Sequence, residues 1–147
     1  MTTSTRQTDV LLRTLADFRF ELRQFLSFSE QAALEVGLHP QQHQLLLQVA
    51  GAPQGISITI AYAAGRLRLK HNSVVELVNR SEKEGLLKRR RDAEDARQVT
   101  LQLTAKGSEL LRRLTHDHAR ELNDLAPRLI DSLRRVQSPE ILPGVEA

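Results

Sequence analysis

The chain has 147 residues, 40% hydrophobic and 27% charged, proportions that indicate one folded domain and exclude a wholly disordered chain. It contains no cysteine, which excludes disulfides, thiolate metal sites and switches based on cysteine oxidation. The formal net charge is +3, and its excess lies between Arg66 and Arg97, where ten Lys or Arg residues accompany six Asp or Glu residues, as expected of a surface that faces a polyanion.

Aromatic residues make up only 3% of the chain, so the core must consist mainly of Leu, Ile, Val and Ala, which favours helices. No apolar run reaches the roughly 18–20 residues needed to span a bilayer. The polar segment 1–7 shows no secretory signal, and we therefore expect a cytoplasmic protein.

The first half of the chain carries the periodicity of helices. Apolar residues at steps of three and four predict a long amphipathic helix over 8–36, and a second helix begins at Pro40 and ends near Gly51. A short helix over 60–67 and another over 71–84 follow, separated by a tight turn. Ser57 or Thr59 is expected to cap the first of these two helices.

After residue 86 the period changes. Residues 87–91 form a basic strand, residues 99–103 alternate apolar and polar side chains, and a polar tip lies between them, so a β-hairpin is predicted. Thr104 then caps a long helix, which Pro127 is expected to break into two. The tail over 138–147 is expected to be loose. The predicted fold class is mainly α with one small β-hairpin.

A short helix, a tight turn, a second helix and a basic hairpin are the layout of a winged helix-turn-helix. In such a unit the second helix fits the major groove of DNA, and an arginine at the hairpin tip can enter the minor groove. Outward polar side chains of helix 71–84 would read bases, and cations beside them would contact phosphates. The residues expected in these two roles are Lys70, His71, Asn72, Ser73, Glu76, Asn79, Arg80, Lys88, Arg89 and Arg91.

The hairpin carries the most specific motif of the chain. Asp95-Ala96-Arg97, followed by a strand that closes on Leu103-Thr104-Ala105-Lys106-Gly107, resembles the wing signature of the MarR (multiple antibiotic resistance regulator) family of bacterial transcription factors. The segment 78–87 resembles the end of the family's recognition helix, and the similarity extends over nearly the whole chain.

The resemblance implies a single domain over 1–147 with a winged lobe over 38–103. Helices 8–36 and 105–137 would form a homodimer interface, and the dimer would bind pseudo-palindromic double-stranded DNA, usually as a repressor released by a small aromatic ligand. By position, Asp95 would hold the wing and orient Arg97 toward the minor groove.

Two residues depart from the expected pattern. Ser81 stands where the family commonly has a core leucine, so either the helix packs differently there or Ser81 bonds back to the chain. Gly65 lies inside a predicted helix, where it costs about 1 kcal/mol relative to alanine.

The sequence defines a ligand crevice or a metal site less closely than it defines the DNA-binding residues. Candidates for a crevice between the dimerisation helices and the lobe are Phe18, Phe25, His39, His43 and Tyr62, which could equally be ordinary core or surface residues. The histidine pairs lack nearby acids at ligand spacing, so we expect no metal and no cofactor.

The sequence also bears on three other classes of function. No phosphate loop, nucleophile elbow or buried pair of carboxylates is visible, so an enzyme is not expected. A winged helix that docks a protein partner is the main alternative, and a non-specific architectural DNA binder is the next.

Overall fold

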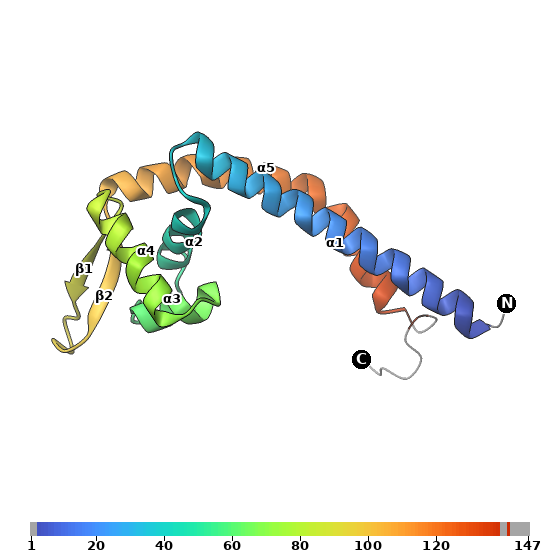
Figure 1. The fold of residues 1–147 in the computed structure, drawn as a ribbon, viewed down its shortest axis with the longest axis horizontal. Helices are drawn as coiled ribbons and strands as arrows, with labels where there is room; N and C mark the ends of the chain where they lie inside the picture. Colours follow the sequence, from blue (N-terminus) through green and yellow to red (C-terminus); the bar gives the residue numbers. More distant parts are fainter. Residues whose placement is uncertain (1–2, 139–140, 142–147) are drawn as a thin grey trace. The chain divides into compact units, whose positions relative to one another are not determined.

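The computed structural model describes residues 3–138 and residue 141. It is mainly helical with one antiparallel hairpin, as predicted (Figure 1). The elements in chain order are α1 (Thr3–Glu35), α2 (Pro40–Ala50), α3 (Ile60–Leu67), α4 (His71–Lys83), β1 (Leu87–Arg91), β2 (Val99–Leu103) and α5 (Ala105–Val136). Among the described residues no helix is long and apolar enough to cross a membrane.

The prediction that Pro127 divides the last helix is wrong, because α5 is continuous through it. Proline removes one helical hydrogen bond at a cost of about 3 kcal/mol. Tertiary contacts hold the helix on both sides of this position: Leu125 is buried at 2% exposure, and Arg128 pairs with Glu21. Most of the tail expected to be loose, residues 139–140 and 142–147, lies outside the described residues.

The chain divides into two compact units. One comprises residues 30–116, here called the lobe, and the other comprises residues 1–29 with 117–147, here called the helical unit. The core of the lobe is built from aliphatic side chains of every one of its elements. Its most buried large members are Leu38, Leu45, Leu46, Val74, Val78, Leu86 and Leu87.

Local signals set the bounds of the helices in the lobe. The Thr59 hydroxyl accepts the Tyr62 N–H at 3.1 Å and so caps α3. Arg68 adopts a left-handed conformation, with φ of 57°, which ends α3 and makes the tight turn to α4. Gly85, with φ of 73°, follows the end of α4 and redirects the chain into the hairpin.

The hairpin pairs β1 with β2 in one register, from Leu87 opposite Leu103 to Arg91 opposite Val99. The Leu101 N–H also donates to the Ile58 carbonyl at 2.8 Å, so the segment before α3 is joined to the outer side of β2. The middle of the hairpin is thereby tied to the segment that leads into the helix-turn-helix.

In the helical unit, α1 and α5 pack antiparallel. Glu21 pairs with Arg128 at 2.9 Å, and the Ser29 hydroxyl lies 2.8 Å from Nε2 of His118, so α5 runs back along α1. Large apolar side chains of both helices remain exposed by 38–59%. These residues, here called the exposed stripes, are Val10, Leu12, Leu15, Phe20, Leu22, Leu26, Leu122, Ile130 and Leu133.

Candidate nucleic-acid interface

The first two turns of α4 carry a row of exposed polar side chains that make no bonds to the rest of the described chain. Lys70 is the N-cap residue and makes no side-chain capping bond, while Val74, Leu77 and Val78 face the core. In the described part of the chain, no hydrogen bond or ion pair uses the side chains on the opposite face. These exposed residues are Lys70, His71, Asn72, Ser73 and Glu76.

The last turns of α4 are joined to the hairpin. Arg89 of β1 donates from Nη2 to Oδ1 of Asn79 at 2.7 Å and from Nη1 to Oε1 of Glu82 at 2.8 Å. The backbone N–H of Arg89 donates to Oε2 of Glu82 at 3.0 Å. Arg89, predicted as a phosphate contact, therefore also links the recognition helix to the wing.

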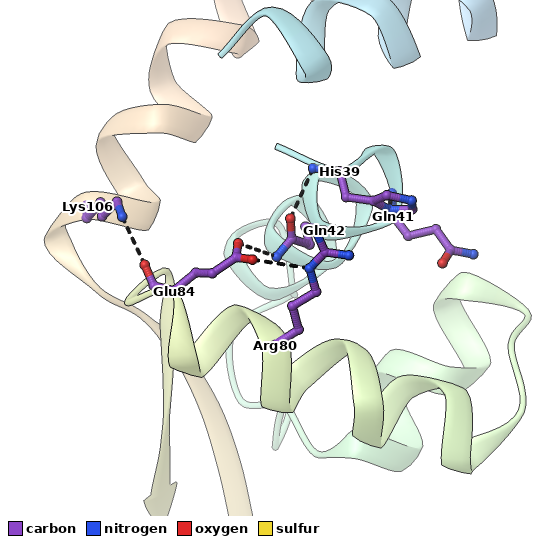
Figure 2. A network of polar contacts seen from close by, with 6 residues as sticks. All are labelled: His39, Gln41, Gln42, Arg80, Glu84 and Lys106. Carbon is purple, nitrogen blue, oxygen red and sulfur yellow. Dashed lines mark hydrogen bonds and ion pairs between the residues drawn. The ribbon is translucent and has the colours of Figure 1, made fainter. Parts of the chain in front are cut away.

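Arg80, another predicted contact, belongs to a network at the end of α4 (Figure 2). It donates to Glu84 at 3.1 Å, and the fully buried Gln42 of α2 donates to the same carboxylate at 2.8 Å. These two hydrogen bonds lower the pKa of Glu84, and the bond from Gln42 has the larger effect. The Gln42 amide oxygen accepts the backbone N–H of His39 at 3.0 Å, so the network joins the start of α2 to the end of α4.

The hairpin tip is shaped by two carboxylates. Asp92 accepts the backbone N–H groups of Glu94 at 2.8 Å and Asp95 at 3.2 Å, and these bonds lower its pKa. Asp95 accepts the backbone N–H of Arg97 at 3.0 Å. No hydrogen bond or ion pair among the described residues uses the Arg97 guanidinium, which is exposed at the tip.

Arg91 and Lys88 complete the basic strand. Arg91 donates to the Ala96 carbonyl at 3.3 Å, which ties the strand to the tip, and Lys88 is half-buried on the opposite face of β1. The cations of the hairpin together give this part of the lobe its positive charge.

The wing signature holds the base of the hairpin. The Thr104 hydroxyl donates to the Gly85 carbonyl at 2.6 Å and accepts the Gly107 N–H at 3.1 Å. A Cβ at Gly107 would lie 2.0 Å from the Leu86 oxygen, so only glycine permits this approach of α5 to the turn after α4. Lys106 donates to the Glu84 carbonyl at 2.9 Å and reinforces the same joint.

Of the two alternatives left open for Ser81, the bond back to the chain is not formed among the described residues. Its side chain is fully buried on α4, and among the described residues its hydroxyl has no hydrogen-bond partner. The family's leucine is thus replaced here by a small side chain that carries an unsatisfied polar atom, so the helix packs around a smaller group.

The residues predicted for a ligand crevice divide between the two units. Phe18 and Phe25 are half-buried in the helical unit, where the Phe25 ring meets His118 edge-on at 6.0 Å between centroids. His39, His43 and Tyr62 belong to the lobe. His39 caps α2, its Nδ1 accepting the Gln41 N–H at 3.2 Å, while His43 is buried and Tyr62 half-buried.

Among the described residues, no group of three or more His, Asp or Glu side chains is arranged to hold a metal ion. Sequence reasoning missed three supporting residues, Gln42, Glu82 and Asp92. The role of Asp92 was predictable from the sequence, since an aspartate in a polar turn commonly accepts the backbone N–H two residues later. Gln42 and Glu82 gave no local signal.

The helix-turn-helix of α3 and α4, followed by a basic hairpin, defines a winged helix-turn-helix protein. The MarR family model matches residues 36–98, which lie within the lobe. The resemblance to this family seen in the sequence is confirmed over these residues. No curated protein matches the chain.

Solved structures share the fold at low identity. A MarR family transcription regulator has a TM-score of 0.75 and 21% identity, with 92% of this chain and 91% of that chain covered. A MepR mutant of S. aureus, bound to an oligodeoxyribonucleotide, has a TM-score of 0.61 and 20% identity over 88% and 95%. CouR of Rhodococcus jostii, bound to p-coumaroyl-CoA, has a TM-score of 0.63 and 18% identity over 84% and 88%.

Proposed function

We propose that this chain is a homodimeric, sequence-specific regulator of transcription, a repressor that a small molecule releases from double-stranded DNA. The observation that carries the proposal is the polar face of α4 from Lys70 to Glu76, which is exposed and makes no side-chain bond within the described chain. A helix whose other face forms the core and whose free face offers Asn, Ser and Glu is suited to read base edges.

The wing would supply the second contact. Arg97 stands at a tip whose backbone is held by Asp92 and Asp95, so its guanidinium is presented on a formed turn rather than on a loose loop. An arginine in this position suits the narrow, electronegative minor groove next to the major groove that α4 would enter. Lys70, His71, Lys88 and Arg91 would contact phosphates.

The exposed stripes support the homodimer. Leu12, Leu15, Leu22 and Leu26 follow one another at helical spacing on α1, and all are 38–59% exposed. Contiguous apolar surface of this kind is normally covered by another protein surface. A second copy would cover it through a two-fold axis, and the two recognition helices would then meet half-sites about 34 Å apart.

Release by a ligand is supported by one of the solved structures with a similar fold. CouR holds p-coumaroyl-CoA, an aromatic acyl compound, in a fold similar to this one. A small aromatic ligand bound near Phe18, Phe25, His39, His43 or Tyr62 would act by changing the spacing of the two lobes, since both helices must match their grooves at once. Such a regulator would work in the cytoplasm, where it meets bacterial DNA.

The test is a salt titration of binding to a duplex from the region upstream of the chain's own gene, beside a scrambled duplex. We expect the first to bind roughly 10³-fold more tightly, with log K falling steeply as log salt rises. Equal binding to several upstream duplexes and to scrambled DNA would favour an architectural binder. No binding at low salt would favour a winged helix that docks a protein.

A further inference from the structure

Arg89 is the most constrained cation of the wing. Its side chain is 28% exposed, and its guanidinium lies between two residues of α4, Asn79 and Glu82. Glu82 holds both the guanidinium and the backbone N–H of Arg89, so the arginine is fixed from two directions. Contacts within the protein therefore hold the Arg89 side chain in place in the absence of DNA.

This arrangement fixes the amide of Asn79. A guanidinium carries only donors, so the atom of Asn79 that meets Nη2 of Arg89 at 2.7 Å must be the amide oxygen. The Nδ2 group is left with two N–H donors, and no hydrogen bond in the described part of the chain uses it. Asn79 thus turns its oxygen toward Arg89, while both donors of its amide stay unused within the described chain.

Asn79 also lies where it can read DNA. It is exposed and follows Asn72 and Glu76 at steps of four and three, which places the three residues in one row along the exposed face of α4. Within this row, Asn79 is the member whose amide is fixed by a contact with the wing.

We propose that Arg89 makes Asn79 a guanine reader. A free asparagine pairs with adenine through both its oxygen and its nitrogen. An amide whose oxygen is held by Arg89 and whose nitrogen is free suits the guanine edge, which carries two acceptors, N7 and O6. Arg89 is therefore a positioning residue that sets base preference through Asn79. The inference rests on the proposed function and names the base that one residue of the recognition helix selects.

The test is a selection from randomised duplexes, followed by affinities for duplexes that differ at one base pair. The Asn79→Ala variant identifies the pair that Asn79 contacts, because preference is lost there and kept elsewhere. At this pair the wild-type protein is expected to prefer guanine to adenine by about tenfold. Arg89→Ala should bring that ratio to about threefold or less. Arg89→Lys, which still donates to the Asn79 oxygen, should retain most of it.

Lys88→Ala is the matched control, because Lys88 lies on the opposite face of β1 and contacts neither residue. It should weaken binding to all duplexes alike and lower the salt slope by roughly 1, whereas Arg89→Ala should leave the slope nearly unchanged. If Arg89→Ala fails to fold, Asn79→Asp serves instead, because it cannot donate and should replace guanine with cytosine.

A wild-type preference for adenine at this pair, or an unchanged guanine preference in Arg89→Ala, would overturn the inference and leave the proposed function standing. A wild-type selection that enriches no sequence, with equal affinity for all duplexes, would overturn both. The two failures are therefore distinguishable.

Discussion

The lobe and the helical unit bury their apolar residues to very different extents. In the lobe, the large aliphatic side chains of the core are 0–8% exposed and come from helices and strands alike. In the described part of the helical unit, the side chains below 9% exposure are Leu125 and three small polar ones, while large apolar residues stand exposed by up to 59%. The lobe completes its core within one chain, whereas the helical unit keeps apolar area for another surface.

A charge placed in the exposed stripes tests whether the helical unit keeps its apolar area for a second copy. Leu15→Glu should raise the dimer dissociation constant on the order of 10³-fold, because a two-fold interface would bury two carboxylates at once. Sedimentation velocity across a concentration series measures this. Gln24→Glu adds the same charge on the polar face of α1 and should leave the dimer intact. A Leu15→Glu chain that remains dimeric like the control would assign the interface to another surface.

The lobe is most vulnerable at Gly107. Gly107→Ala should lower the free energy of unfolding by about 3 kcal/mol, because its Cβ would meet the Leu86 oxygen at 2.0 Å and the backbone would have to shift. Gly65→Ala is the control, since no atom lies within 4 Å of a Cβ there and helix propensity should add about 0.5–1 kcal/mol. Equal effects in chemical denaturation would contradict the tight approach at Gly107.

Arg97 separates binding from folding within the lobe. Arg97→Ala should weaken DNA binding roughly tenfold, as expected for one arginine contact, with the melting temperature unchanged. Fluorescence anisotropy and calorimetry give the two values. Arg113→Ala, an exposed arginine of α5 in the same unit, should change neither. A fall in the melting temperature of Arg97→Ala would assign this arginine to structure.

The smallest expected effect concerns the hydroxyls of the lobe. Ser81→Ala should raise the free energy of unfolding by about 1 kcal/mol, because it removes a buried polar atom without a partner among the described residues. Thr104→Ala should lower it by about 1–2 kcal/mol, because that hydroxyl makes two bonds at the start of α5. Destabilisation by both changes would mean that Ser81 contributes a contact after all.

The features that were predictable are those with a local cause. The cap of α3, expected from Ser57 or Thr59 and formed by Thr59, depends on neighbours within a few residues, as does the alternation of β2. Pro127 was misjudged because packing on both sides of it outweighs the local cost. The contact of Arg89 with Asn79 depends on how the wing folds back on α4, which no local pattern encodes.

Gln42 makes the joint between α2 and α4 directional. Its oxygen meets an N–H and its nitrogen meets a carboxylate, so turning the amide over would oppose donor to donor and oxygen to oxygen. A misdocked arrangement of these helices would therefore lose the bond to Glu84 and leave the buried Gln42 nitrogen unsatisfied. Aliphatic side chains alone would allow several packings of α2 against α4 with similar energies. The buried amide of Gln42 is satisfied in one of them and therefore selects it.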